Sequence, residues 1–433
     1  MRKLAFFGLI VLLVTGALSA EPELELHLAP TTRVVLSNGL TLLVRERHDI
    51  NNVGIYLSLG AGQLTEEDSQ KGITNLLQNY LLEIPIKSYH DAATAIESKG
   101  GVIGASAGSD ASFFDLNVTK EEFPFALEIV SALLHIHSIN NPIFNEAKEN
   151  DLNEIRRESQ ESYQFLYNLF LQEFYSFHPY KSPVIGLAGT VKNLKSQDLL
   201  DYFGQYYVPN NMVLSIVGDV NTDQVIKLVN KYFFDLKERA KRSKNIYYQP
   251  ILDDDKQIQL QSSSNVAWLF LGFSAPELKS PDYPAMDVIN SILGASMSSR
   301  IWLSIREKHA LSYELGSSYS AREGPSHFII YVATSPDNLL ESRGHLLKEV
   351  ERIRREPLTE DEILITKRRL IGQFILSLET NAAQANFLSS SEIAGRGMMY
   401  DEAYIQSLEK VTSAEVLRVA KKYLENYIFI SVE

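Results

Sequence analysis

Three neutral amide side chains share one side of a short amphipathic segment, residues 72–82, with the sequence GITNLLQNYLL. Asn75 and Asn79 are four positions apart, and Gln78 comes three positions after Asn75. In a helix, residues at i, i+3 and i+4 lie on one side, close enough to hold one cation. The apolar residues follow the helical period on the opposite side, which predicts a helix. The spacing is that of a metal site, but the side chains are amides.

Amides serve neither task that this spacing usually supports. With histidine at 75 and 79 and glutamate at 78, the segment would read H-x-x-E-H, the inverted zinc-peptidase motif. There, two imidazoles bind zinc and the carboxylate takes a proton from the metal-bound water. An amide oxygen is a poor zinc ligand, and Gln78 has no group that accepts a proton near neutral pH. The residues alone leave two interpretations open: a solvated helix face, or a zinc site without its chemistry.

Other metal sites are not apparent in the sequence. The chain has no cysteine, which excludes disulfides, thiolate catalysis and cysteine-ligated zinc. Among the nine histidines, His135 and His137 are two positions apart, but their surroundings predict the end of a helix followed by a turn. No compensating metal site is therefore predicted.

The chain reads as two similar halves. Residues 53–62 and 266–276 are apolar, β-rich runs that lead into amphipathic helices. Residues 100–118 and 313–333 each resemble two strands around a Gly/Ser-rich turn. Strands come in neighbouring pairs with long helices between them, which favours a mainly antiparallel sheet with helices packed on it. We therefore predict a tandem duplication of one α+β domain.

Domain boundaries and targeting follow from composition. The predicted domains are residues 31–236 and 258–433, joined by a linker at residues 237–257. Residues 1–20 combine basic residues, an apolar run and small residues, as in a secretory signal peptide, so we expect an exported, periplasmic protein. No later segment predicts an integral membrane span. The formal net charge of -13 argues against nucleic acid as a partner.

The order of the motifs resembles the pitrilysin/insulinase family of zinc peptidases, which includes the mitochondrial processing peptidases. The segments that carry the resemblance are SNGLTLLVRE, GIYLSLGAGQLTEED, KGITNLLQNYLL, ESKGGVIGASAGSDASFFDL, NEIRRE and HPYKSPVIG. The resemblance implies that Asn75 and Asn79 replace the two zinc histidines and that Gln78 replaces the general base. It implies that Glu154 matches the third ligand, while Ala147 replaces an acid that often precedes it. We therefore expect a degenerate zinc site, no metal in this chain, and Glu154 as a helix-surface carboxylate.

A second candidate site lies in residues 298–320. Ile301, Ile305 and Leu311 predict a helix that runs into a strand at Tyr313. Arg306 and Tyr313 are seven positions apart, and the family carries an Arg/Tyr pair at this spacing. The resemblance implies that the two side chains hold a peptide carbonyl while negative charge develops on it. Without the resemblance, an ordinary polar helix end and a packed strand tyrosine explain them.

The first Gly-rich hairpin is a candidate binding surface. The resemblance implies that an extended substrate pairs with an exposed edge strand at residues Gly104, Ala105, Ser106 and Ala107. Tight turns made by the glycines are the equal alternative.

These expectations combine into one functional hypothesis. Some bacterial relatives are split into two chains, one with H-x-x-E-H and the other with only the Arg/Tyr pair. We expect this chain to be the second kind: the non-catalytic subunit of a heterodimer that cleaves unstructured peptides with zinc held by the partner subunit. The alternatives are a non-enzymatic scaffold or binding protein of the same fold, and a weak residual metallopeptidase that binds metal through Glu154 and the amides.

Overall fold

The structure is a computed structural model that describes residues 26, 28–240, 249, 251–262 and 264–433. The predicted signal peptide, residues 1–20, lies outside the described residues, as do residues 241–248 and 250 of the expected linker. In the part of the chain that is described, no helix combines the length and the apolar character needed to span a membrane.

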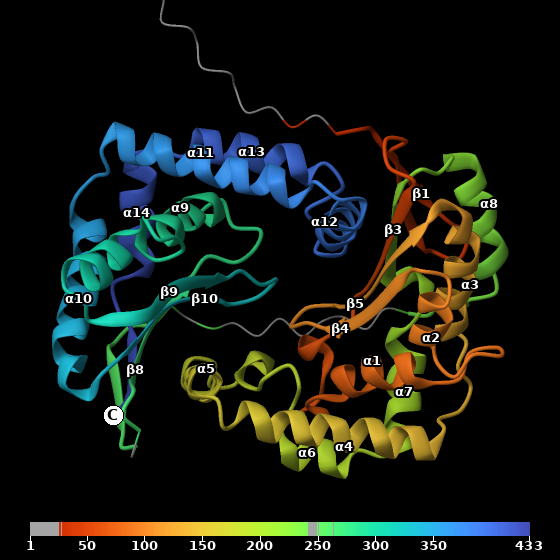
Figure 1. Cartoon of the computed structure of the whole chain (residues 1–433), viewed down its shortest axis with the longest axis horizontal. Coiled ribbons are helices and arrows are strands. Elements are labelled where there is room, and N and C mark those ends of the chain that lie inside the picture. Colours follow the sequence, from red (N-terminus) through yellow and green to blue (C-terminus); the bar gives the residue numbers. More distant parts are fainter. Residues whose placement is uncertain (1–25, 27, 241–248, 250, 263) are drawn as a thin grey trace, which may run out of the picture.

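The first half is built on a six-stranded sheet with the order β1-β2-β6-β3-β5-β4 (Figure 1). Only β2 and β6 run parallel; every other pair is antiparallel. Every residue of β6 is buried, which fits its apolar sequence MVLSIVG and its position inside the sheet. The strands are β1 Thr31–Val35, β2 Thr41–Glu46, β3 Asn52–Leu59, β4 Val102–Ala107, β5 Ser112–Thr119 and β6 Met212–Gly218.

The second half repeats this topology. Its five-stranded sheet has the order β7-β11-β8-β10-β9, which matches β2-β6-β3-β5-β4 strand for strand, with the parallel pair in the same place. The predicted duplication and the α+β class with mainly antiparallel sheets are thus confirmed. β7 begins at Lys256, inside the segment expected to be a linker. The strands are β7 Lys256–Leu260, β8 Ala267–Ala275, β9 Ser312–Ser320, β10 Ser326–Thr334 and β11 Ile428–Val432.

Helices pack on both sheets and enclose two apolar cores, one in each half. The helices of the first half are α1 Ile73–Glu83, α2 Ala92–Glu97, α3 Phe123–Leu133, α4 Asn141–Glu158, α5 Ser162–Phe174, α6 Ala188–Asn193, α7 Ser196–Tyr206 and α8 Thr222–Phe233. Those of the second half are α9 Tyr283–Leu293, α10 Leu339–Arg355, α11 Glu360–Ser377, α12 Asn381–Ile393, α13 Tyr400–Lys410 and α14 Ser413–Tyr423. A π-helix, Trp302–Lys308, precedes β9.

The two halves exchange one helix each. α12 belongs to the second half in sequence but packs on β3 and β6, and Figure 1 shows it beside β3. Reciprocally, α5 of the first half packs on β8 and β11. Each receiving strand carries a glycine at the contact: a Cβ on Gly54 would lie 2.5 Å from the Ala382 nitrogen, and one on Gly272 would overlap the Phe170 ring. The close approach of helix to strand therefore requires the absence of a side chain.

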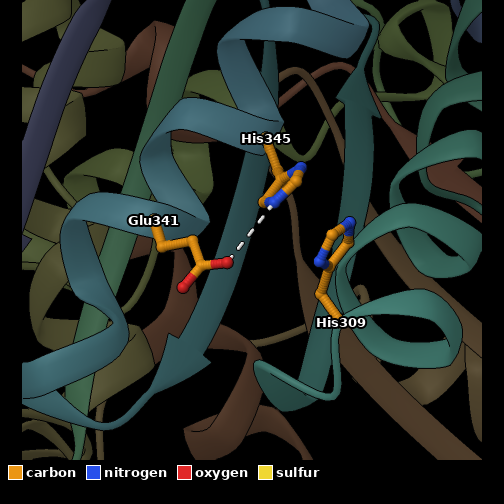
Figure 2. A group of neighbouring side chains, drawn as sticks. All are labelled: His309, Glu341 and His345. Carbon is orange, nitrogen blue, oxygen red and sulfur yellow. Dashed lines mark ion pairs between the residues drawn. The ribbon is translucent and has the colours of Figure 1, made fainter.

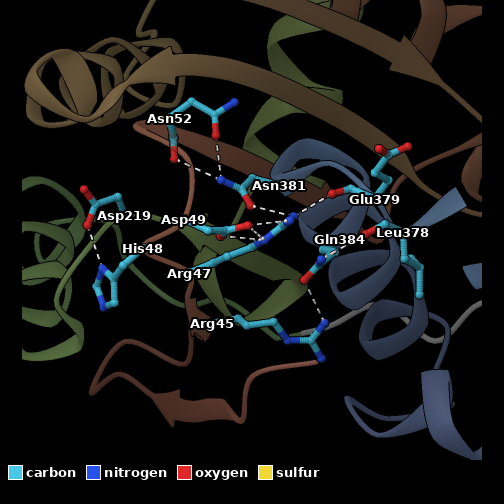
Figure 3. Close-up of polar contacts among 10 residues, drawn as sticks. All are labelled: Arg45, Arg47, His48, Asp49, Asn52, Asp219, Leu378, Glu379, Asn381 and Gln384. Atoms are coloured by element: carbon cyan, nitrogen blue, oxygen red, sulfur yellow. Dashed lines mark hydrogen bonds and ion pairs between the residues drawn. The ribbon is translucent and has the colours of Figure 1, made fainter. Parts of the chain in front are cut away.

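Polar contacts hold the exchanged α12 in place (Figure 3). Asn381, at its first position, donates to the Asn52 side-chain oxygen at 2.6 Å, and Arg45 donates to Gln384 at 3.2 Å. The second arm of Arg45 forms an ion pair with Asp401 at 2.7 Å, in which both side chains are at most 5% exposed. Because a buried charge is costly without its partner, this pair ties β2 to α13.

Candidate functional site

Helix α1 carries the three amides and is anchored at its start by a buried carboxylate. Gly72, the N-cap residue, has a φ of 95°, and a Cβ there would lie 2.6 Å from the Ile185 carbonyl oxygen. Glycine is therefore required at this turn. The Glu66 carboxylate accepts hydrogen bonds from the backbone N–H groups of Gly72 at 3.0 Å and Thr74 at 3.1 Å. A negative charge is favoured at a helix N-terminus, so Glu66 fixes the direction of α1.

Asn75 and Asn79 both donate to one carboxylate, that of Asp151 on α4. The amide of Asn79 reaches Asp151 Oδ1 at 2.7 Å, and that of Asn75 reaches Oδ2 at 3.2 Å. Asp151 is only 2% exposed. Burial raises the pKa of its carboxyl group to about 6, although the two amide hydrogen bonds act in the opposite direction. The amide side of α1 is thus covered by α4, and its interpretation as a solvated face is wrong.

Gln78 is fully buried and contacts Tyr207, the residue that follows α7. Its amide nitrogen donates to the Tyr207 hydroxyl at 2.8 Å. Its amide oxygen is also buried, and no hydrogen-bond partner for it exists among the described residues. A buried amide in this place holds two helices together, and it neither accepts a proton nor contacts solvent.

Glu154 lies one turn beyond Asp151 on α4 but points into a different environment. It forms an ion pair with Arg157, and both side chains are more than a third exposed. This is the surface pairing expected for a carboxylate without metal partners, and such exposed pairs contribute little to stability. Ala147, on the preceding turn of α4, is completely buried.

The groups at this position do not fit a zinc ion. Structural and catalytic zinc sites use imidazole, thiolate and carboxylate ligands at about 2.0–2.3 Å. Here two amides direct their N–H groups at Asp151, which occupies that carboxylate, and Glu154 is paired with an arginine. Asp151 and the amides therefore form a hydrogen-bonded helix contact, Glu154 takes no part in it, and we derive no metal chemistry from these residues.

Arg306 and Tyr313 lie together in the second half. One guanidinium nitrogen of Arg306 donates to the Tyr313 carbonyl oxygen at 2.9 Å, and the guanidinium lies over the Trp302 ring at 4.5 Å from its centroid. The Tyr313 side chain is directed to solvent, with an exposure of 88%. The role of the pair in substrate binding remains a prediction. The Tyr313 side chain is thus free for other contacts, while its backbone carbonyl holds the Arg306 guanidinium.

The backbone that carries this pair is unusual. The predicted helix is a π-helix, Trp302–Lys308, and Ala310 follows it with a φ of 53°, a left-handed conformation that alanine rarely adopts. π-helical turns occur mostly as short insertions and are frequent at functional sites. Strained backbone of this kind persists where the surrounding structure over-determines it. β9 then begins at Ser312.

Residues Gly104 to Ala107 belong to β4, the last strand in the order of the first sheet. No described strand pairs with its outer edge, and α1 packs close to it. Substrate pairing along this edge remains a prediction. Residues 104–108, GASAG, also match the G-x-S-x-G pattern of serine hydrolases, but they lie in a strand that leads into a hairpin. The strand-to-helix elbow which that chemistry needs is therefore missing at this place.

Two groups of residues at these sites were not predicted from the sequence. The first is Asp151, which precedes Glu154 by three positions and shares a side of α4 with Ala147; this helical spacing could have indicated it. The second group is His309, Glu341 and His345, which the fold brings together from two segments. The i, i+4 spacing of Glu341 and His345 was visible in the sequence, but nothing there pointed to His309.

Known proteins resemble the chain along almost its whole length. Residues 42–187 match the model of the insulinase family (peptidase family M16), and residues 193–370 match the peptidase M16 inactive domain. An uncharacterized zinc protease, YmxG of Bacillus subtilis, is 24% identical over 91% of this chain and 96% of its own length.

Solved structures share the fold. A protease from Helicobacter pylori superposes with a TM-score of 0.87 at 20% identity, covering 94% of this chain and all of the other. A peptidase M16 inactive domain from Pseudomonas fluorescens gives a TM-score of 0.85 at 18% identity, over 93% of this chain and 98% of that one.

Proposed function

Because the chain belongs to the insulinase family of peptidases, family M16, we propose that it is the non-catalytic subunit of a heterodimeric zinc metallopeptidase. Its partner is a homologous chain that carries H-x-x-E-H, and its substrate is an unstructured peptide. The chain itself contributes substrate binding.

One observation carries the proposal: the amide–carboxylate contact between α1 and α4. Asn75 and Asn79 donate to Asp151 at 3.2 and 2.7 Å, and Gln78 is buried against Tyr207. A helix that is tied in this way has neither ligands for zinc nor a base for water. The scaffold around it is nevertheless complete, which supports a retained binding role for the fold.

In the proposed complex, Arg306 and Tyr313 orient the substrate carbonyl. The guanidinium offers a rigid fork of donors and is always charged, and only one of its N–H groups is used to hold the Tyr313 carbonyl. The exposed Tyr313 hydroxyl adds a directed donor. Both groups stabilise negative charge on a carbonyl oxygen. Zinc in the partner subunit would supply the activated water.

The edge of β4 is the proposed track for the peptide. An extended chain adds to an exposed strand edge through main-chain hydrogen bonds, which depend little on sequence. Gly104, Ala105, Ser106 and Ala107 have small side chains that leave room for the side chains of a bound peptide. We place this activity in the periplasm, because residues 1–20 have the pattern of a signal peptide.

The test is reconstitution. The purified mature chain is mixed with a family member that carries H-x-x-E-H, from the same organism, and cleavage of a quenched fluorescent peptide is followed with and without a zinc chelator. We expect zinc-dependent cleavage by the mixture and none by this chain alone. Arg306→Ala should lower the rate about 10²- to 10³-fold, as the loss of one oxyanion donor does in other hydrolases.

Arg355→Ala is the matched control, because Arg355 is a 77% exposed arginine of the same half whose ion pair among the described residues, with Glu351, lies within α10. It should leave the rate unchanged. If the partner alone cleaves as fast as the mixture, this chain contributes nothing and the proposal is wrong. If Arg306→Ala behaves like Arg355→Ala, the subunit role survives but the assignment of the pair does not.

A further inference from the structure

Three side chains of the types that can bind metal ions, His309, Glu341 and His345, meet in the second half (Figure 2). Glu341 and His345 come from adjacent turns of α10, and His309 comes from the residue that ends the π-helix. One ligand atom from each of the three lies within 4.8 Å of those from the other two. The three side chains converge from two separate segments of the fold.

The distances are close to those of a metal centre. His345 Nε2 and Glu341 Oε1 are 3.8 Å apart, and the two imidazole rings have centroids 4.1 Å apart. Ligand atoms of a tetrahedral zinc ion are separated by about 3.4 Å when each bond is about 2.0–2.2 Å long. A small rotation of the exposed Glu341 side chain reduces this difference. Glu341 is 57% exposed and His345 20%, so an ion has a path to the group and room for a water ligand.

The backbone at His309 gives an independent reason to expect a ligand. His309 directly follows the seven-residue π-helix, and Ala310 has a φ of 53°. A π-helix adds a residue to the turn and so redirects the side chains after it. The unfavourable backbone at these residues places the His309 ring against His345. Strain of this kind is typical of sites where geometry serves binding.

We propose that His309, Glu341 and His345 form a binding site for a divalent transition-metal ion of the zinc class. Two imidazoles and one carboxylate with an open position are a known ligand set for zinc and for other borderline ions. Hard ions such as Mg²⁺ and Ca²⁺ prefer all-oxygen sites and do not suit this group. The site uses contacts of the second half only, so it does not depend on the heterodimer.

Such an ion would link the end of the π-helix to α10. His309 lies between Arg306 and Tyr313 in sequence, so a bond from His309 to a metal held by α10 restrains the segment that carries the pair. His309, Glu341 and His345 would act as positioning residues, because the proposed ion acts through the segment that carries Arg306 and Tyr313. The inference thus adds a structural metal to a chain whose amide face on α1 does not fit one.

Metal binding by the full mature chain tests the site. Equilibrium dialysis against Zn²⁺, with elemental analysis, should find one ion per chain, and Co²⁺ should give the visible absorption of a low-coordinate nitrogen/oxygen site. His345→Ala and Glu341→Gln should each weaken Zn²⁺ binding by more than about 100-fold, since loss of an outer hydrogen bond to a ligand already costs 10- to 100-fold. Zn²⁺ should also slow hydrogen exchange of residues 306–313.

Two control variants are matched to the alternatives. His90→Ala removes an exposed histidine of the first half, and Asn79→Ala changes the amide face of α1; both should retain full binding. Thermal melting of each metal-free variant confirms that it folds. Zinc binding that is unchanged in His345→Ala and Glu341→Gln would overturn the inference, and so would loss of binding in Asn79→Ala. Peptide cleavage is not measured here, so failure of the site is separable from failure of the heterodimer.

Discussion

Replacing Asp151 by asparagine should change how the stability of the first half depends on pH. Burial raises the pKa of Asp151 from 3.8 to about 6 in the folded chain. The folded state therefore holds a proton on this group more tightly than the unfolded state does between these two values. Stability from this group is fully present below about pH 3.8 and is lost as the pH rises to about 6 and beyond.

The size of the effect follows from the pKa difference. A rise of about two pKa units corresponds to about 3 kcal/mol in the free energy of unfolding, of which about 2 kcal/mol falls between about pH 4.5 and about pH 7.5. Asp151→Asn is neutral at both pH values and keeps one of the two amide hydrogen bonds. Relative to the natural chain, the variant should therefore gain about 2 kcal/mol of stability as the pH rises over this range.

Urea denaturation followed by far-ultraviolet circular dichroism measures this difference. Tryptophan fluorescence is unsuitable because Trp268 and Trp302 both lie in the second half. Asp201→Asn, a change at an exposed aspartate of α7, is the control. Its free energy of unfolding should change with pH in the same way as that of the natural chain. If the free energy of unfolding of Asp151→Asn changes with pH as that of the natural chain does, within about 0.5 kcal/mol, then Asp151 is not a buried carboxylate and our account of the amide face is wrong.

Further predictions concern the contact between the halves and the proposed role of Arg306 and Tyr313. Gly54→Ala should destabilise the chain by about 1–3 kcal/mol in the same denaturation assay, since its Cβ would lie 2.5 Å from the α12 backbone. The control, Gly344→Ala on α10, places its Cβ in open space and should be neutral or stabilising by up to about 1 kcal/mol. Arg45→Met should cost about 3–5 kcal/mol because it leaves Asp401 buried without its partner, and adding Asp401→Leu should restore much of the loss. Tyr313→Phe should leave stability within about 0.5 kcal/mol, given an exposure of 88%, but lower cleavage by the reconstituted heterodimer about 10²-fold; equal rates would remove Tyr313 from the site.

Local pattern was sufficient to predict much of the fold. The helical spacing of Ile73, Leu77 and Leu81 defines α1, and paired β-rich runs around polar turns define the hairpins of both sheets. These features depend on neighbours in sequence, so periodicity reveals them. The repetition of the pattern in the second half then predicts a second domain of the same topology.

The exchanged helices could not be predicted in this way. An amphipathic pattern indicates that one face of a helix is buried, but it does not say against which sheet. In α12 the pattern is also weak, because the buried face is made largely of small and polar residues such as Ala385 and Ser389, with Leu388 as its main apolar contact. Only the close fit against Gly54 explains why small residues are used there.

The candidate site was likewise predictable only in its local part. The spacing of Asn75, Gln78 and Asn79 predicts that they share a helix side, but their partners Asp151 and Tyr207 lie far away in sequence. A solvated face and a buried hydrogen-bonded face have the same composition, so the sequence left both open. The sequence predicts an ordinary helix where the structure has the π-helix Trp302–Lys308, because apolar spacing over so few residues does not distinguish an α-helical from a π-helical period.

Because α5 and α12 each pack on the sheet of the other half, the two structural bodies do not coincide with the two halves of the sequence. The body that moves with the first sheet includes α12, and the body that moves with the second sheet includes α5. The chain passes between the two bodies at residues 159–161, 175–187, 378–380 and 394–399, as well as in the connection between the domains, so any hinge between them lies in these segments. The two bodies are thus joined by several chain segments, and the length of these segments limits how far the bodies can separate.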